Sequence, residues 1–338
     1  MTGAVTVIDV GGTHLRWANW TPERGTWGRR SALSPNFRRY PTLSAPELQT
    51  RLIDSICDIV PHTDDTIVGL SFGAALNQLT GTVYASAPLW GPYDTPLNVL
   101  DILSRKRGDV AWHVVNDVTA ALLHVASQEL CKQDRKVMLV TISTGIAART
   151  IDRRTSRIPL DASGLQGEIG HLPMSAVLFD RPIILKCDCG EPGHLSAYAS
   201  GPGIRQMALA LRERYPRDWE NSLLGHGDGM PWEETFSSAL VAGDSIATKL
   251  LDAVTAPVAD VLRTALCLDP DLDRIVLTGG VAVGLGAHYR NAILSHLRCK
   301  GLYLTSKFTP QWIEDRIVVS DADCLVGAGI AALMERVP

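Results

Sequence analysis

Residues 5–18 read VTVIDVGGTHLRWA, and this stretch indicates the fold. Its first six residues are mostly apolar and β-branched, which predicts a buried strand. Gly11-Gly12-Thr13 predicts a turn, because glycines adopt backbone conformations that other residues avoid. The apolar residues between Leu15 and Trp20 predict a strand that returns along the first. We therefore expect a hairpin with the carboxylate of Asp9 at the end of its first strand.

Residues 137–151, VMLVTISTGIAARTI, repeat this arrangement. An apolar strand leads into the turn Ser143-Thr144-Gly145, and residues 147–151 return. A chain of 338 residues is long enough for about two domains. Two such hairpins favour a duplicated α/β fold in which they would face one another across a cleft. We expect a first lobe over residues 1–125 and a second over residues 126–338.

Strands and helices alternate through most of the remaining chain, as in other α/β proteins. Ser44-Ala-Pro-Glu47 is typical of a capping box with proline in the first turn, and it predicts a helix. Residues 20–43 are rich in Arg, Pro and Ser and are interpreted as a surface loop, with an edge strand as an option. The other predicted elements are strands over 67–71, 113–115 and 275–277, a helix after Asn116-Asp117, and a last helix over 324–335. We expect this last helix to pack back on the first lobe.

The composition excludes several classes of protein. Apolar residues make up 46% of the chain, charged residues make up 20%, and the formal net charge is −4. This balance argues against binding to nucleic acid or anionic lipid through bulk charge. No apolar run approaches the roughly 18 residues of a membrane span, and the first residues lack the basic region of a signal peptide. Together with seven scattered cysteines, this predicts a cytoplasmic protein without a nucleic-acid or membrane partner.

Glycine-bearing turns after strands are typical of phosphate-binding sites, because their backbone N–H groups can approach phosphate oxygens. In the first turn the Thr13 hydroxyl adds a donor, and Asp9 would hold Mg²⁺ through water. The alternative is an ordinary hairpin in which these residues serve the turn alone. The stretch is neither a Walker A motif nor the dinucleotide-binding glycine pattern. A third such turn is Thr278-Gly279-Gly280-Val281.

Two closely spaced blocks suggest a metal site. Residues 164–171 read GLQGEIGH, and residues 187–196 read CDCGEPGHLS. His171, Cys187, Cys189 and His194 form a Cys₂His₂ set, which suits a four-coordinate structural Zn²⁺. Two glycines at positions 190 and 193 allow the tight loop that such ligands need. The alternative is a pair of unligated thiols with unrelated histidines.

The three glycine-bearing turns resemble the phosphate-1, phosphate-2 and adenosine motifs of the sugar kinase/actin/Hsp70 superfamily. The two blocks are similar to the Gly-Glu-x-Gly-His core and the Cys-x-Cys-Gly-x-x-Gly-Cys-Leu-Glu segment of the ROK family (repressors, open reading frames and kinases). Over nearly its whole length the chain resembles the glucokinase-like kinases of this family. This implies a duplicated actin-like (RNase H-like) ATPase fold with two lobes around a cleft, and a homodimer. It also implies that ATP and Mg²⁺ are bound by Asp9, Gly11, Gly12, Thr13, Thr144, Gly145, Gly279 and Gly280.

The resemblance also assigns roles around the substrate. It implies that Asp117 is the catalytic base, that Asn116 is its sugar-binding neighbour, and that Glu168 accepts hydrogen bonds from substrate hydroxyls. His171 would both ligate zinc and contact the sugar. Without the resemblance, Asn116-Asp117 would be interpreted as a helix cap, since both residue types are favoured there.

Three departures from the family pattern bear on function. His194 stands where the family has its third cysteine, which keeps the number of zinc ligands. Ser196, a substrate-binding position, stands where the family has a glutamate near the anomeric end of a hexose. The second turn carries Ser143, two alanines and Arg149 in place of glycines. We expect Arg149 to face solvent; the alternative is an additional anchor for the nucleotide.

The sequence therefore predicts an ATP-dependent kinase that phosphorylates the primary hydroxyl of a hexose-like substrate. The loss of the glutamate at Ser196 disfavours glucose. It favours a modified hexose, an amino sugar, or a sugar-like C7-cyclitol of the kind that relatives phosphorylate in aminocyclitol biosynthesis. The alternatives are an ordinary glucokinase and, less favoured, a sugar-binding regulator without catalysis.

Overall fold

The computed structural model describes residues 4–63, 65–93, 95–227 and 229–334. The chain divides into two compact units, each with its own core. Unit 1 comprises residues up to 132, residues 158–166 and the chain from residue 322. Unit 2 comprises residues 133–157 and 167–321. The boundary predicted at residue 125 lies inside a helix that ends at Ser127, and this explains why the structural division comes later.

The sheet of unit 1 contains the first predicted hairpin. Its strand order is β3-β2-β1-β4-β8. The antiparallel part is formed by β1 (Val5–Val10), β2 (His14–Thr21) and the edge strand β3 (Gly25–Leu33). β4 (Thr66–Phe72) and β8 (Val110–Asn116) run parallel to β1. The carboxyl ends of β1, β4 and β8 therefore lie along one edge of the sheet.

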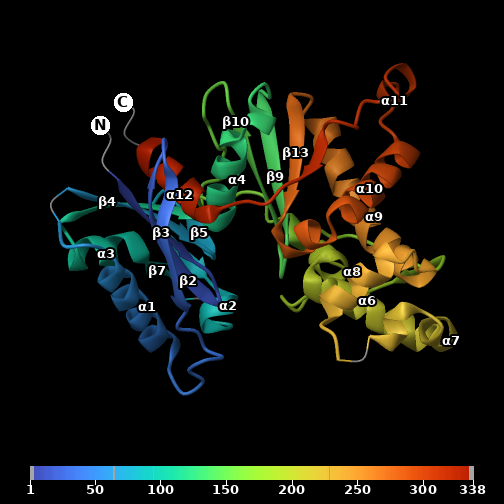
Figure 1. The fold of residues 1–338 in the computed structure, drawn as a ribbon, viewed down its shortest axis with the longest axis horizontal. Helices are drawn as coiled ribbons and strands as arrows, with labels where there is room; N and C mark the ends of the chain where they lie inside the picture. Colours follow the sequence, from blue (N-terminus) through green and yellow to red (C-terminus); the bar gives the residue numbers. More distant parts are fainter. Residues whose placement is uncertain (1–3, 64, 94, 228, 335–338) are drawn as a thin grey trace. The chain divides into compact units, whose positions relative to one another are not determined.

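Helices cover both faces of this sheet, and the strand residues alternate accordingly. Ile8 and Val10 belong to a core with α1 (Ala45–Ile59) and α3 (Val99–Lys106). Val5 and Val7 belong to a core with α12 (Cys324–Met334), which packs on β1, β4 and α4 (Asp117–Ser127) (Figure 1). The smaller elements of this unit are β5 (Ala75–Asn77), β6 (Thr82–Ala85), β7 (Leu97–Asn98), α2 (Ala87–Trp90) and the 3₁₀ turn η1 (Glu129–Cys131).

Glycines allow α12 to lie unusually close to its neighbours. A Cβ atom added at Gly327 would lie 1.7 Å from the carbonyl oxygen of Ala120 in α4. A Cβ atom added at Gly69 in β4 would lie 2.2 Å from the carbonyl oxygen of Ala328. Side chains at these positions would therefore push the helix away from the sheet and from α4.

Unit 2 repeats the hairpin next to parallel strands, as the sequence predicts. Its sheet has the order β10-β9-β13-β14. β9 (Lys136–Ile142) and β10 (Ile146–Asp152) are antiparallel, while β13 (Leu272–Thr278) and β14 (Ile317–Val319) are parallel to β9. A separate small hairpin is formed by β11 (Ala176–Leu178) and β12 (Arg181–Ile183). The predicted α/β fold class is confirmed.

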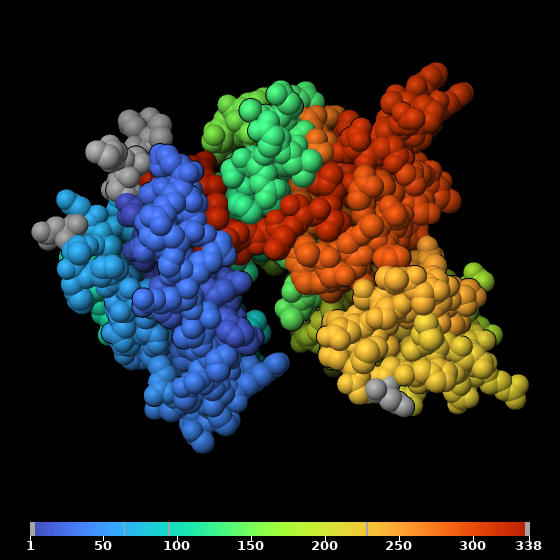
Figure 2. All heavy atoms as spheres, viewed as in Figure 1, coloured from blue at the N-terminus to red at the C-terminus, as the bar shows by residue number. Residues whose placement is uncertain are grey.

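The helices of unit 2 surround α9 (Ser245–Leu268), which packs on α10 (Gly279–Lys300). On the face seen in Figure 2, the residues coloured yellow to orange form a continuous surface. The others are α5 (Leu195–Ala199), α6 (Gly201–Arg214), α7 (Pro216–Glu220), α8 (Trp232–Val241), α11 (Thr305–Phe308) and the 3₁₀ turns η2 (Ile169–His171) and η3 (Leu223–His226). Within the described residues, no helix has both the length and the apolar character needed to cross a membrane.

Candidate functional site

Asp9 lies buried at the carboxyl end of β1, opposite Ser71 of β4. Its Oδ1 atom accepts a hydrogen bond of 2.8 Å from the Ser71 hydroxyl. Its Oδ2 atom accepts hydrogen bonds of 3.0 and 2.5 Å from Nε and Nη2 of the half-exposed Arg16 on β2. Burial raises the pKa of Asp9, although Arg16 and Ser71 act in the opposite direction. These hydrogen bonds thus hold the Asp9 carboxylate in a fixed orientation at this edge of the sheet.

The turn after Asp9 is braced by two side chains from residues 20–43. The Ser34 hydroxyl donates to the carbonyl of Gly11 at 2.7 Å, and the Asn36 amide donates to the carbonyl of Gly12 at 2.9 Å. A Cβ atom at Gly12 would lie only 2.3 Å from Cβ of Pro88, so a larger residue does not fit there. The sequence analysis did not predict these two hydrogen bonds, because polar residues in a loop show no periodic pattern.

Asn116 and Asp117 lie at the carboxyl end of β8, where α4 begins. Asn116 caps the helix: its Oδ1 atom accepts from the N–H of Val118 at 2.9 Å, and its Nδ2 atom donates to the carbonyl of Ala74 at 2.8 Å. Asp117 is partly exposed, and its Oδ1 atom also accepts from Val118. A Cβ atom at Gly73 would lie 3.3 Å from Oδ2 of Asp117. Capping therefore accounts for Asn116 and leaves the Asp117 carboxylate at the sheet edge that also carries Asp9.

In unit 2, two of the predicted nucleotide motifs meet in one cavity of about 480 Å³. Thr144 of the β9–β10 turn and Gly280 at the start of α10 both line it. Gly279 has φ +89°, and a Cβ atom there would lie 2.5 Å from the carbonyl oxygen of Ile142. The lining residues are Ser143, Thr144, Gly201, Pro202, Ile204, Arg205, Trp232, Glu233, Phe236, Gly280, Val281, Gly284 and Leu285. Volumes of about 300–1,000 Å³ are typical of sites for small ligands.

An aromatic wall on α8 forms part of this cavity, and the sequence analysis missed it. The rings of Trp232 and Phe236 are stacked at 5.6 Å, and Trp219 stacks on Trp232 at 6.3 Å. Arg205 of α6 and Glu233 of α8 form an ion pair of 2.6 Å beside them. The signal in the sequence was the spacing of Trp232 and Phe236, which places both rings on one face of a helix.

The four predicted zinc ligands come together in unit 2. The ligand atoms of His171, Cys187, Cys189 and His194 all lie within 4.8 Å of one another, and Sγ of Cys189 is 3.2 Å from Nδ1 of His194. Two thiolates and two imidazoles are a donor set that four-coordinate zinc takes, so these residues fit the ion chemically. The loop is tight because the N–H of Gly190, at φ +103°, donates to the carbonyl of Cys187. The segment of chain between His171 and Cys187 contains the β11–β12 hairpin.

Glu168 caps η2, His171 ends it, and Ser196 lies on α5; η2 contacts both β10 and α5. The carbonyl of Gly167 accepts a hydrogen bond of 2.8 Å from the N–H of Ala148. This bond fixes the loop that carries Gly167 and Glu168 to β10. A Cβ atom at Gly170 would lie 2.4 Å from the hydroxyl oxygen of Ser196. Ser196 therefore lies against the backbone between Glu168 and His171.

The expectation that Arg149 faces solvent is wrong. Its side chain is 1% exposed, because the loop that carries Gly167 and Glu168 covers this part of β10. Nη1 donates to the carbonyl of Ala148 at 3.0 Å, and Nη2 lies 3.7 Å from Oε1 of Glu168. Arg149 is also not among the residues that line the cavity, so the structure gives no support to a nucleotide anchor there.

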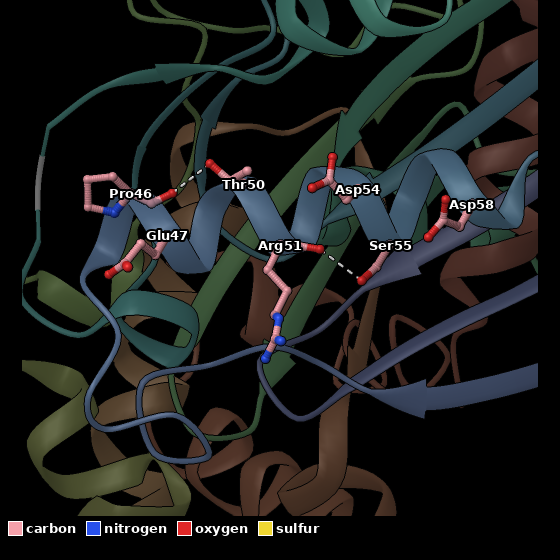
Figure 3. A pocket seen from close by; sticks show the side chains of 7 residues that line it. All are labelled: Pro46, Glu47, Thr50, Arg51, Asp54, Ser55 and Asp58. Atoms are coloured by element: carbon pink, nitrogen blue, oxygen red, sulfur yellow. Dashed lines mark hydrogen bonds between the residues drawn. The ribbon is translucent and has the colours of Figure 1, made fainter.

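A second hollow, of about 550 Å³, lies along the exposed face of α1 (Figure 3). Two of its acidic groups have local partners: Glu47 accepts from Ser44, and Asp54 pairs with Lys106 at 2.7 Å. The hydroxyls of Thr50 and Ser55 donate to carbonyls of the same helix. None of the predicted site residues lies here, so this hollow is not the candidate site.

A model of the ROK family matches residues 5–313 of the chain. The chain is 52% identical to a 2-epi-5-epi-valiolone 7-kinase of Actinoplanes sp., with 97% of this chain and 92% of that protein covered. It is 31% identical to a C(7)-cyclitol 7-kinase of Streptomyces hygroscopicus subsp. limoneus, with 96% and 92% covered. A ROK family glucokinase from Streptomyces griseus, solved with glucose and AMPPNP, has a TM-score of 0.69 at 21% identity, with 98% of this chain and 100% of that chain covered. The fold is thus that of the ROK sugar kinases. Because the family model and both relatives extend over most of its length, this protein belongs to the ROK family.

Proposed function

We propose that this protein is an ATP-dependent kinase that phosphorylates the primary hydroxyl of a C7-cyclitol. The observation that carries the proposal is the 52% identity, over nearly the full length of both chains, to a protein named 2-epi-5-epi-valiolone 7-kinase. The second relative, named C(7)-cyclitol 7-kinase, supports the same class of acceptor. The competing acceptors are a modified or amino hexose and, for an ordinary glucokinase, glucose itself.

Asp117 is the proposed catalytic base. A primary hydroxyl must lose its proton as its oxygen attacks the γ-phosphorus, and a carboxylate within hydrogen-bond reach can accept that proton. The position of Asp117 at the end of β8, next to a helix cap already provided by Asn116, supports this role. Asn116 is proposed to contact the acceptor beside it.

The phosphates of ATP are proposed to bind at the glycine-bearing turns. Backbone N–H groups of Gly11, Gly12 and Thr13 in unit 1, and of Thr144 and Gly145 in unit 2, would face phosphate oxygens. The cavity lined by Gly280, next to Gly279, would take the adenosine, with the rings of α8 as an apolar wall. Asp9 would hold Mg²⁺ through water, and the ion would supply positive charge to the transferring phosphoryl group.

The proposed zinc has a structural role. His171, Cys187, Cys189 and His194 would hold it, and the carboxylates needed for phosphoryl transfer are not among these ligands. By fixing His171, the ion would fix the wall that also carries Glu168 and Ser196. The acceptor would then contact Glu168, His171 and Ser196 in unit 2.

Ser196 is the residue that supports a cyclitol over glucose. A carboxylate at this position could only accept hydrogen bonds, whereas a hydroxyl can donate or accept one. The hydroxyl of Ser196, lying against Gly170, removes a negative charge from the place where glucose would present its anomeric end. Rings with a different pattern at that end are therefore favoured.

We further propose that units 1 and 2 are the two lobes of the kinase, that the chain forms a homodimer, and that it is cytoplasmic. Each of the two large sheets contains an antiparallel hairpin, β1–β2 in unit 1 and β9–β10 in unit 2. This repetition supports a duplicated fold. A sedimentation measurement that gives the monomer mass at micromolar concentration would contradict the dimer.

The proposed function is tested by an acceptor screen with Mg·ATP. Glucose, mannose, N-acetylated and amino hexoses, and C7-cyclitols are compared on the wild type and on Ser196→Glu. We expect the wild type to prefer a C7-cyclitol, and Ser196→Glu to gain activity on glucose. The matched control is Ser245→Glu, which adds the same carboxylate at the exposed first position of α9. A helix N-terminus tolerates negative charge, so this control should keep the wild-type order of acceptors.

Two outcomes would overturn the proposal. A wild-type preference for glucose of tenfold or more would identify an ordinary glucokinase and refute the inference from Ser196. Binding of a cyclitol without any phosphoryl transfer would instead identify a sugar-binding regulator.

A further inference from the structure

Arg149 carries a charged side chain to which the proposed reaction assigns no role. It lies on β10, is 1% exposed, and is among the largest fully buried side chains of the described residues. Removing a guanidinium from water is strongly unfavourable unless an opposite charge and hydrogen bonds compensate it. The burial of Arg149 therefore indicates a stabilising partner or a functional role for its charge.

One acidic neighbour of Arg149 is Glu168, a proposed substrate-binding residue. Nη2 of Arg149 lies 3.7 Å from Oε1 of Glu168, whose side chain remains 49% exposed. The loop that carries Glu168 is fixed to the same strand by the hydrogen bond from Ala148 to Gly167. Oε1 of Glu168 thus lies near the buried guanidinium, while about half of the Glu168 side chain stays accessible.

We propose that Arg149 is a positioning residue that orients the Glu168 carboxylate toward a ring hydroxyl of the acceptor and balances its charge. This inference rests on the proposed function. The formal charges of Arg149 and Glu168 sum to zero, and the neighbouring Ser196 is uncharged. The wall of unit 2 formed by these three residues therefore suits an uncharged polyhydroxylated ring. A cationic amino hexose gains little from a carboxylate whose charge is already compensated.

The inference is tested with Arg149→Met, which keeps the length of the side chain and removes its charge. We expect the KM for the cyclitol to rise about tenfold and the KM for ATP to stay within twofold. The ratio of kcat/KM for an amino hexose to kcat/KM for the cyclitol should rise about tenfold, because the Glu168 charge is then uncompensated. Arg149→Lys should recover part of the loss, since it restores the charge without the planar guanidinium.

The matched control is Arg274→Met. Arg274 forms a largely buried ion pair with Asp134 at 2.5 Å, near the amino-terminal end of β13, whereas Gly280 follows the other end of that strand. This variant should change the melting temperature and leave the KM values and the acceptor ratio unchanged. A third arm combines Arg149→Met with Glu168→Gln. Its effect on the cyclitol KM should be clearly smaller than the product of the single effects, because the two residues act as a unit.

Additive effects in the double variant, or equal rises in the KM values for cyclitol and ATP, would show that Arg149 only stabilises the fold. If Arg149→Met does not fold, Arg149→Lys and Glu168→Gln test the same acceptor ratio. If the wild type phosphorylates nothing, the proposed function fails, and calorimetric binding of the same acceptors to wild type and variants then decides on Arg149. Absence of both transfer and binding would overturn both proposals.

Discussion

Asp117 carries the central chemical step of the proposed reaction. Asp117→Asn keeps the shape of the side chain and removes its ability to accept a proton, so kcat should fall by roughly 10²–10⁴. The zinc content and the melting temperature should stay unchanged, because Asn116 still caps α4. Steady-state kinetics of this variant provide the measurement, with Asp101→Asn in the first turn of α3 as the control. An unchanged kcat would show that Asp117 has only a structural role.

Asp109 links stability to pH far from the proposed chemistry. Two hydrogen bonds, of 2.9 and 2.7 Å, from the Arg107 guanidinium lower the pKa of Asp109 to about 2. An unfolded aspartate has a pKa of about 3.9, so the pair stabilises the fold above that pH and loses its effect as the pH falls toward 2. Denaturant unfolding from pH 5 to 2 should therefore show a steeper loss of stability for wild type than for Asp109→Asn. Parallel curves for the two proteins would contradict this assignment.

At the scale of elements, we expect the loop between η2 and α5 to depend on the proposed zinc. Elemental analysis of the purified protein should find about one zinc per chain. Cys187→Ser/Cys189→Ser should lose it and raise the KM for the acceptor, because His171 and the neighbouring wall are no longer fixed. Cys267→Ser/Cys299→Ser removes two exposed thiols elsewhere in the unit and should keep the zinc. A metal-free protein with full activity would refute the site.

The elements that position the proposed site were predictable where local chemistry decides the structure. Glycine-bearing turns between apolar runs marked both hairpins, and Asn116 marked the start of α4. The glutamate of the capping motif does accept hydrogen bonds from Ser44, in front of α1. These signals depend on a few neighbouring residues, and the fold retains them.

The parts that escaped prediction depend on contacts between distant segments. Trp232 and Phe236 line a cavity only because α8 lies near the turn that carries Thr144. Arg149 is buried because the loop with Glu168 lies against β10, whereas we expected this residue to face solvent. No local pattern of residues encodes such coverage.

At the scale of the molecule, unit 1 is assembled from separated parts of the chain. Gly327 lets α12 approach α4 so closely that Gly327→Ala would place a Cβ atom 1.7 Å from the Ala120 carbonyl oxygen. We expect this variant to lower the free energy of unfolding by about 1–3 kcal/mol, the usual cost of overpacking. Gly284→Ala in α10 is the control, since a Cβ atom there meets nothing within 4 Å. Equal stabilities of the two variants in urea would show that α12 can shift without cost.

The order of the segments also affects how the protein is made. α12 covers Val5, Val7 and Trp20, yet it follows the whole of unit 2 in the sequence. At about 5–20 residues per second, a ribosome needs roughly 10–40 s to synthesise residues 133–321. During that interval the apolar face of the first strands has no helix to cover it. The first unit to begin leaving the ribosome is thus the last to be completed, and this apolar face of the nascent chain stays uncovered until α12 has been synthesised.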